Sequence, residues 1–318
     1  MTASYDGSMT TDATGTAPDR RAVVDVHPAG DAAPELRDPS LPVLHIDDLA
    51  AVRGDGIFET FMVRDGEVRN LDRHAGRFTN SAGMLDLPAP DLDRWIAATD
   101  LALVRWAELG GGDASLRWMY SRGRESTGIP TGWVTVAPES PAVSRDRDNG
   151  VAVMTAHRGY SLDISRDAAP WALVGAKTLS YAANMAALRY ARAHGLDDVI
   201  FTAADDGEGS DRVLEGPTST VIAVRDRDGV REILTPLPEV GVLPGTTQAA
   251  LFRSAGDAGW TCREAPLTVA DLFDADGVWL LSSVRRYARV TALDGTPLGR
   301  PDCAAEIEEL ATRAAEGR

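Results

Sequence analysis

The first residue whose type points to chemistry is Lys177, the single lysine of the chain. The sequence holds 32 Lys and Arg residues in total, and all the others are arginine. An arginine guanidinium does not lose its proton in a protein, whereas a lysine amine does and then forms a Schiff base with a carbonyl carbon. The alternative explanation is chance, because a strong bias toward arginine could leave a single lysine without any chemical role. The position of Lys177, after an apolar stretch at 171–174 and before an expected helix, favours a site.

A second candidate is Glu215, which lies between Leu214 and Gly216. A buried carboxylate that faces a pyridine nitrogen keeps that nitrogen protonated and makes the ring an electron sink. A solvated glutamate on a strand is the ordinary alternative, and Glu215 alone does not separate the two.

A third group of residues carries hydroxyl groups and one guanidinium, all of which donate hydrogen bonds to phosphate oxygens. Thr246 and Thr247 follow a Pro-Gly pair at an expected helix start, where free amides and hydroxyls bind phosphate, although threonine also caps helices without a ligand. Ser282 and Ser283 end an expected strand, and Arg77 lies on an early helix. Together with the lysine and the glutamate, these residues predict the site of a phosphorylated aldehyde cofactor.

Alternating and helical patterns predict the elements that position these residues. In the first half we expect a strand at 56–63, a turn at Asp65-Gly66 with a return at 68–71, a helix from Asp72, a helix over 92–109 and a strand at 115–120. In the second half we expect a strand at 151–155, a helix over 179–193, a strand at 198–202, a hairpin over 212–224 that carries Glu215, helix-then-strand passages at 246–262 and 269–283, and a helix over 304–315.

This mixture of strands and helices has no regular βαβ repeat, so the sequence predicts an α+β fold. The segment at 137–149 is the best linker candidate because it has two prolines and alternating charges. We therefore expect a disordered tail at 1–20, a smaller N-terminal domain at 21–145 and a larger C-terminal domain at 146–318.

Composition excludes several classes of partner. The chain has 318 residues and a net charge of −16, which repels nucleic-acid phosphates and anionic lipids, so we expect neither nucleic acid nor membrane as a partner. No apolar run reaches about 18 residues and no signal peptide is visible, so we expect a cytoplasmic protein. The cysteines Cys262 and Cys303 are expected to be structural filler, and the five histidines show no metal-ligand spacing.

Six segments, taken in order, resemble the class IV aminotransferase family, the fold-type IV enzymes that use pyridoxal 5′-phosphate (PLP). The resemblance covers about residues 44–298. The matching segments are RGDGIFET at 53–60, Asp72 to Phe78, Lys177 with its following helix, VLEG at 213–216, LPGTT at 243–247 and LSS at 281–283.

The resemblance implies a role for each candidate residue. Lys177 would carry PLP as a Schiff base and Glu215 would pair with the pyridine nitrogen. Tyr181 would lie beside the phenolic oxygen, one position nearer the lysine than in branched-chain enzymes. The phosphate group would be held by Arg77, Thr246, Thr247 and Ser283, with Ser282 beside them. The family also implies a small N-terminal α/β domain, a larger barrel-like C-terminal domain and a homodimer.

The same resemblance narrows the substrate, which is a small molecule in every case. Phe58 stands where D-amino acid aminotransferases have a tyrosine. The Arg-X-His motif with which those enzymes bind the substrate carboxylate is missing from 121–129. Arg122 and Arg124 are therefore the candidates for binding a substrate carboxylate. The segments at 120–125 and 177–182 look most like actinobacterial 4-amino-4-deoxychorismate lyases, which make 4-aminobenzoate, a folate precursor, and pyruvate. A class IV aminotransferase acting on D- or branched-chain amino acids and a non-catalytic PLP-binding protein are the alternatives.

Overall fold

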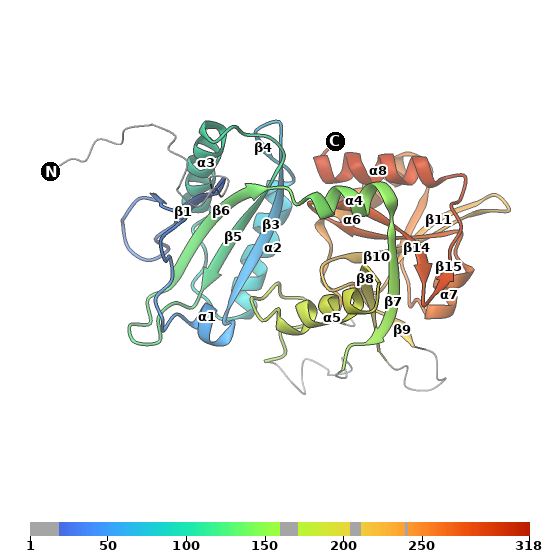
Figure 1. The fold of residues 1–318 in the computed structure, drawn as a ribbon, viewed down its shortest axis with the longest axis horizontal. Coiled ribbons are helices and arrows are strands. Elements are labelled where there is room, and N and C mark those ends of the chain that lie inside the picture. The colour runs from blue at the N-terminus through green and yellow to red at the C-terminus, as the bar shows by residue number, and fades with distance from the viewer. Residues whose placement is uncertain (1–18, 160–170, 204–210, 239–240) are drawn as a thin grey trace.

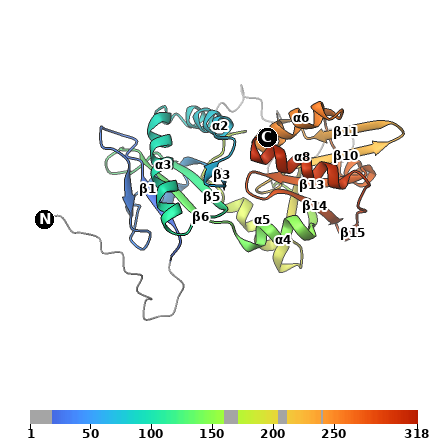
Figure 2. The ribbon, with the colours of Figure 1, turned by 90° about the horizontal axis from the view of Figure 1, so that it is seen from above.

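The computed structural model describes residues 19–159, 171–203, 211–238 and 241–318. Within these ranges the chain forms two lobes, each built on a β-sheet, which lie side by side (Figures 1 and 2). The predicted tail at 1–20 lies almost entirely outside the described residues. The α+β character and the two-lobed arrangement expected from the sequence are confirmed.

The first lobe is an antiparallel sheet in the strand order β2-β1-β6-β5-β3-β4, covered on one face by helices α2 and α3. Its elements are β1 (Ala22–Asp25), β2 (Glu35–Arg37), α1 (Leu49–Arg53), β3 (Gly56–Arg64), β4 (Glu67–Val68), α2 (Leu71–Met84), α3 (Leu92–Glu108), β5 (Ala114–Ser121) and β6 (Thr131–Pro138). Apolar side chains alternate along the strands, so one face packs on the helices. Phe78, Trp95 and Trp118 form the centre of this core, with ring centroids 4.8 to 5.4 Å apart.

The second lobe is a mixed sheet in the order β12-β11-β10-β13-β14-β7-β8-β9, with β15 paired to β14. Its elements are α4 (Pro141–Asn149), β7 (Val151–His157), α5 (Ala182–Ala193), β8 (Asp198–Ala203), β9 (Arg212–Val213), β10 (Thr220–Arg227), β11 (Val230–Thr235), α6 (Thr246–Asp257), β12 (Thr261–Glu264), α7 (Val269–Asp274), β13 (Gly277–Ser282), β14 (Arg286–Leu293), β15 (Thr296–Pro297) and α8 (Ala304–Glu316). Helices α6 and α8 pack on one face of this sheet, and α7 contributes Leu272 to the core on the other face.

The segment between the lobes is a helix rather than an irregular linker. Ser140 caps α4 by accepting a hydrogen bond from the amide of Ala142, and Pro141 occupies the first turn, where its missing N–H costs nothing. Helix α4 packs on β14, so it belongs to the body of the second lobe.

The expected hairpin over 212–224 does not form. Strand β9 pairs with β8, and β10 pairs with β11 and β13, so Glu215 lies in the loop between β9 and β10. The real hairpin joins β10 to β11 through Asp228 and Gly229, both of which have positive φ angles, as the favoured two-residue turn requires. Pro217 has no N–H to donate to a ladder, which adds to the disadvantage of the expected local pairing.

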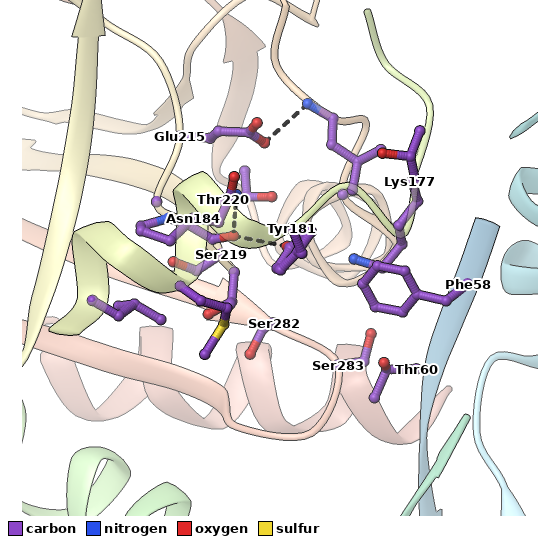
Figure 3. A pocket seen from close by; sticks show the side chains of 18 of the residues that line it. Phe58, Thr60, Lys177, Tyr181, Asn184, Glu215, Ser219, Thr220, Ser282 and Ser283 are labelled. Atoms are coloured by element: carbon purple, nitrogen blue, oxygen red, sulfur yellow. Dashed lines mark hydrogen bonds between the residues drawn. The ribbon is translucent and has the colours of Figure 1, made fainter. Parts of the chain in front are cut away.

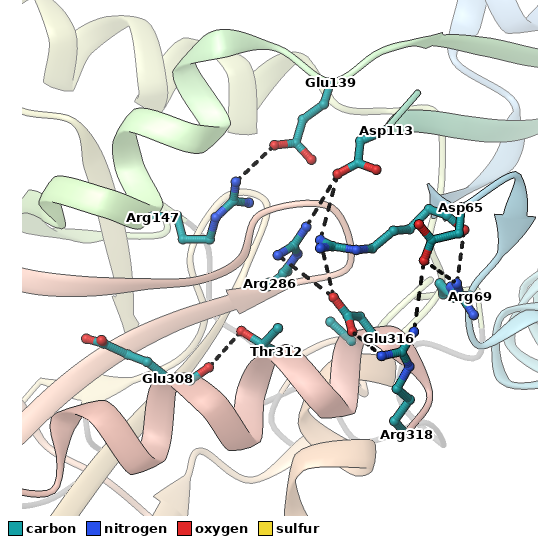
Figure 4. Close-up of polar contacts among 12 residues, drawn as sticks. Asp65, Arg69, Asp113, Glu139, Arg147, Arg286, Glu308, Thr312, Glu316 and Arg318 are labelled. Atoms are coloured by element: carbon teal, nitrogen blue, oxygen red, sulfur yellow. Dashed lines mark hydrogen bonds and ion pairs between the residues drawn. The ribbon is translucent and has the colours of Figure 1, made fainter. Parts of the chain in front are cut away.

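A cluster of ion pairs joins the end of α8 to the first lobe (Figure 4). The carboxylate of Glu316 lies 3.2 Å from Arg64 on β3 and 4.0 Å from Arg286 on β14, and Asp113 also lies within 4 Å of both arginines. The side-chain amide of Asn70 donates to the carbonyls at 314 and 315 in the last turn of α8, where a helix end has fewer backbone donors than carbonyls. These contacts fix the orientation of one lobe against the other.

Among the described residues, no helix combines the length and apolarity that crossing a bilayer requires.

Candidate active site

A cavity of about 1110 Å³ opens where the two lobes meet. The first sheet contributes Phe58 and Arg117 to its lining. The segment before α5 contributes Lys177, and the second lobe contributes Glu215; Figure 3 shows these two side chains together with Phe58. The cavity therefore exists only when both lobes are in place.

The backbone around Lys177 is fixed by hydrogen bonds to the first lobe. The Phe58 amide donates to the Lys177 carbonyl at 3.0 Å, and the Leu179 amide donates to the Gly56 carbonyl at 2.8 Å. The Lys177 amide in turn donates to the hydroxyl of Ser81 at 3.1 Å. Because residues 177–179 pair with β3 in this way, α5 begins at Ala182 rather than at the expected residue 179.

The Lys177 amine lies inside the cavity, with Nζ 4.5 Å from the centroid of the Phe58 ring and 5.9 Å from that of Tyr181. Removal of the amine from water and the nearby charge of Arg77 lower its pKa from 10.5 to about 8, against the opposing effect of Glu59 and Glu215. A lysine of this kind is partly neutral near physiological pH. It is therefore suited to attack a carbonyl carbon.

Both carboxylate oxygens of Glu215 are held by hydrogen bonds. Oε1 accepts from Nη2 of Arg158 at 2.6 Å, and Oε2 accepts from the Leu243 amide at 3.0 Å. A Cβ at Gly216 would lie 2.3 Å from the Ser219 hydroxyl and 3.2 Å from the Val199 carbonyl oxygen, so a larger residue here would displace the Ser219 side chain. The carboxylate is thus presented to the cavity in one orientation.

Tyr181 packs edge-on against Phe58, with ring centroids 5.3 Å apart. Its hydroxyl donates to the Pro217 carbonyl at 2.7 Å, and the side-chain amide of Asn184 donates to the same oxygen. Burial and the charge of Glu215 raise the pKa of Tyr181 to about 12. The phenol therefore stays protonated and fixed beside the lysine.

The first turn of α6 forms a cradle of hydrogen-bond donors at one end of the cavity. Helix α6 has no side-chain cap at Gly245, so the amides of its first turn lack helical partners. A Cβ at Gly245 would lie 2.4 Å from Oγ1 of Thr220, so a larger residue here would displace the Thr220 side chain. The Thr246 hydroxyl lies 3.5 Å from that of Ser283, and Thr247 and Ser282 also line the cavity.

Arg77 reaches this cradle from α2. Nε and Nη2 donate to the two oxygens of Glu59 at 2.6 and 2.8 Å, and Nη1 donates to the Pro244 carbonyl at 2.8 Å. A guanidinium has five N–H groups, so two donors remain for a ligand. The structure thus brings the predicted phosphate-binding residues of both lobes together.

Two buried residues at this site were missed by sequence reasoning. Glu59 is fully buried, and although burial alone raises its pKa, the charge of Arg77 and hydrogen bonds from Arg77 and His74 lower it to about 2. The His74 imidazole bonds to Glu59 at 2.7 Å, and burial lowers its pKa. The available signals were a carboxylate at a core-facing position of a strand and a His-X-X-Arg spacing, which places both side chains on one helix face.

The two arginines expected to bind a substrate carboxylate lie outside the cavity of this chain. Arg122 pairs with Asp55 at 2.7 Å, and Arg124 pairs with Asp47 at 3.0 Å. A different arginine, Arg117 on β5, lines the cavity, and none of the described residues accepts a hydrogen bond from its guanidinium or forms an ion pair with it. Strand alternation was the available signal, because Arg117 lies between two core residues.

These residues fit PLP. The cradle offers free amides, hydroxyls and a guanidinium to a phosphate group, and the glycines at 216 and 245 leave space that a Cβ would fill. Glu215 provides a fixed carboxylate for a pyridine nitrogen, and Lys177 provides an amine with a lowered pKa.

Comparison with known proteins agrees with this geometry. The bifunctional aminodeoxychorismate lyase / D-amino acid transaminase of Mycobacterium tuberculosis is 47% identical over 279 residues, which are 87% of this chain and 94% of the relative. A PLP-bound aminotransferase structure from M. tuberculosis superposes with a TM-score of 0.85 at 45% identity, over 92% of this chain and 98% of that chain. A fold-type IV transaminase from Curtobacterium pusillum superposes with a TM-score of 0.83 at 38% identity, over 93% and 97% of the two chains.

The resemblance seen in the sequence is confirmed by a family model. The model for class IV amino-transferases matches residues 56–293, which include Lys177 and Glu215 and exclude only the two ends of the chain. The protein belongs to the class IV aminotransferase family of PLP-dependent enzymes.

Proposed function

We propose that the protein is a 4-amino-4-deoxychorismate lyase, which converts its substrate into 4-aminobenzoate and pyruvate. The observation that carries this proposal is the guanidinium of Arg117, which has no partner among the described residues and lies on the wall of the cavity that holds the Lys177 amine. The proposed substrate has a carboxylate on the ring and a second one on the enolpyruvyl group, and a guanidinium binds such a group through two parallel hydrogen bonds. The relative that is 47% identical carries this activity in its name.

The residues of the chain divide the chemistry between them. When bound, PLP supplies an electron sink for the carbon that carries the substrate amine. The Lys177 amine accepts the proton from that ring carbon, and Glu215 holds the proton on the pyridine nitrogen. The C–O bond to the enolpyruvyl group then breaks. Protonation of the released enol gives pyruvate, and loss of the group leaves the ring aromatic.

Arg117 and Phe58 belong to the part of the cavity wall that the first sheet contributes. On β3 and β5, Thr60 lies directly across from Arg117, and Phe58 lies across from Met119. The wall therefore combines one cation with apolar side chains, which suits a ring that carries carboxylates. Thr178 and Tyr181 bound the cavity on the lysine side.

A second candidate function is transamination of D-amino acids, because the 47% identical relative is named for both activities. Every cofactor residue serves both reactions. Arg117 suits this function too, because it would bind the distal carboxylate of a dicarboxylic acid such as 2-oxoglutarate.

One set of assays separates these functions. The purified enzyme with PLP is given 4-amino-4-deoxychorismate in one reaction, and D-alanine or a branched-chain amino acid with 2-oxoglutarate in others. Formation of 4-aminobenzoate and pyruvate supports the lyase. Glutamate formation in the absence of these products overturns the lyase in favour of the transaminase, and absence of all products favours a protein that binds PLP without turnover.

The larger organisation is also part of the proposal. We infer two domains that meet at the start of α4, a few residues before the boundary of 145 and 146 expected from the sequence, and a homodimer located in the cytoplasm. Support for the dimer comes from large apolar side chains that a single chain leaves in water, with Ile46 97% and Trp171 77% exposed. Light scattering of the purified protein tests the dimer, and a monomer mass at micromolar concentration would contradict it.

A further inference from the structure

His74 connects a buried carboxylate to two hydroxyls of the cradle. Its Nδ1 lies 2.7 Å from Oε2 of Glu59, and its Nε2 lies 3.3 Å from Oγ1 of Thr246 and 3.2 Å from Oγ of Ser283. The four side chains come from β3, α2, α6 and the turn after β13. The Phe61 ring packs against the imidazole, with centroids 4.7 Å apart, so water is kept from this side.

The hydrogen positions in this chain follow from the charges. Glu59 is ionised and only accepts, so Nδ1 of His74 must donate to it. Burial lowers the pKa of His74, so in the absence of a ligand the imidazole is neutral and Nε2 carries a lone pair. At least one of the hydroxyls of Thr246 and Ser283 must then donate its hydrogen to Nε2, because a buried lone pair without a donor is costly.

A phosphate group in the cradle competes for the same hydrogens. Phosphate oxygens accept hydrogen bonds, and each hydroxyl has one hydrogen to give. A hydroxyl that donates to His74 does not donate to phosphate at the same time. If Thr246 and Ser283 turned to the phosphate and His74 stayed neutral, its Nε2 would be left buried without a partner.

The charges around His74 oppose one another in the absence of a ligand, because Glu59 favours the positive imidazole while Arg77 and Lys177 disfavour it. From β3 it faces Glu59, from its own helix Arg77, and from the segment before α5 Lys177, while α6 and the turn after β13 present only hydroxyls. Arg77 is neutralised by Glu59 through two hydrogen bonds. A phosphate dianion therefore adds negative charge that the Arg77–Glu59 pair does not balance, which favours a positive imidazole.

We propose that His74 is a positioning residue that takes up a proton from solvent when the phosphate group of the cofactor binds. The new proton on Nε2 is donated to a hydroxyl oxygen, which frees the hydrogens of Thr246 and Ser283 for the phosphate. This inference rests on the phosphate location proposed for the cradle. The reaction itself needs no proton from His74, so the coupling acts on cofactor affinity.

Calorimetry measures this proton directly. The probe is pyridoxamine 5′-phosphate, which has no carbonyl group and does not condense with Lys177. It is titrated into cofactor-free protein at about pH 8, in buffers of different ionisation enthalpy, where the phosphate is already a dianion because its second pKa is about 6. We expect the wild type to take up about one proton more than the His74→Gln variant, whose amide donates but does not titrate.

The pH dependence gives a second readout. Where the free protein has neutral His74 and the complex has charged His74, wild-type affinity falls with pH more steeply than that of the variant, by about one further factor of ten per pH unit. The slope that both proteins share reports other groups, such as Lys177, whose pKa is about 8. His74→Asn, which retains a donor toward Glu59, is a second non-titrating variant and shares the expected result. His194→Gln is the matched control, because His194 is exposed at the end of α5, where its imidazole bonds to the Tyr190 carbonyl and packs on the Tyr190 ring.

The outcomes are distinct. Proton uptake that persists in both His74 variants, together with weaker binding, overturns the coupling and leaves the phosphate in the cradle. Unchanged proton uptake with unchanged affinity overturns both the coupling and the proposed phosphate location. Loss of the proton in the His74 variants, with the His194 variant behaving as wild type, supports the proposal.

Discussion

Arg77 binds both carboxylate oxygens of Glu59, through Nε at 2.6 Å and Nη2 at 2.8 Å. Glu59 is fully buried on β3, so the guanidinium is oriented before any ligand arrives. An arginine held in this way loses little side-chain entropy when it binds an anion. The relationship explains why a carboxylate lies next to a site that receives a phosphate group.

Replacement of Glu59 tests this orientation. In Glu59→Gln, Arg77 keeps one acceptor but loses the paired charge, and we expect a destabilisation of about 3 kcal/mol, the size measured for broken buried pairs. We also expect weaker PLP binding. Thermal unfolding and cofactor titration check both effects, and a variant with wild-type stability and affinity would contradict this role for the pair.

Lys177→Arg keeps the positive charge but removes the amine that is able to lose its proton. We expect a folded protein whose turnover falls by at least about 10²- to 10⁴-fold, the usual contribution of a general base. Borohydride reduction of the PLP-loaded wild type should leave a pyridoxyl group on Lys177, detected by peptide mass spectrometry. PLP-loaded protein in which that lysine remains unmodified would refute the assignment.

The pH dependence of covalent PLP attachment follows from the same lysine. Its pKa is lowered from 10.5 to about 8, so the fraction of neutral amine in the cofactor-free protein rises through pH 8. We expect the rate of attachment, followed by absorbance, to rise with pH and to level off above about 8. A rate that keeps rising toward pH 10.5 would mean that the amine is not perturbed.

Arg117 offers the sharpest test of substrate recognition. Because Arg117 has no protein partner among the described residues, Arg117→Gln should change stability by no more than about 0.5 kcal/mol. Loss of a charged hydrogen bond worth about 1.5 to 3 kcal/mol should raise KM for 4-amino-4-deoxychorismate by about 10- to 150-fold. Arg124→Gln is the control outside the cavity. A raised KM in Arg124→Gln with an unchanged KM in Arg117→Gln would instead assign binding of the substrate carboxylate to residues 122–124.

Two glycines of α6 form a matched pair. Gly245→Ala places a Cβ 2.4 Å from Oγ1 of Thr220 at the cradle, so we expect weaker PLP binding and a loss of about 1 to 3 kcal/mol. Gly256→Ala, near the other end of the same helix, meets nothing within 4 Å and should stabilise the protein by up to about 1 kcal/mol. Equal effects of the two substitutions on PLP affinity would argue against the cradle.

The sequence predicted residues whose type and local context are sufficient to show a role. Lys177 was identified because it is unique, and Thr246 because it follows a Pro-Gly pair at a helix start. Glu59 and His74 were missed because each is explained only by a partner on another element. The hairpin over 212–224 was wrong for the same reason, since strand partners far along the chain outweighed local alternation.

The ion-pair cluster at the end of α8 has a consequence for the order of events during synthesis. Helix α8 follows every other described element along the chain, and Glu316 at its end contacts Arg64 of the first lobe. N-terminal domains generally fold first while the ribosome is still adding residues. Arg77 is therefore made long before Thr246 and Ser283, and the contacts of Glu316 with the first lobe form only once α8 has been made. The first lobe thus waits, already folded, for the half of the cradle that completes its phosphate site.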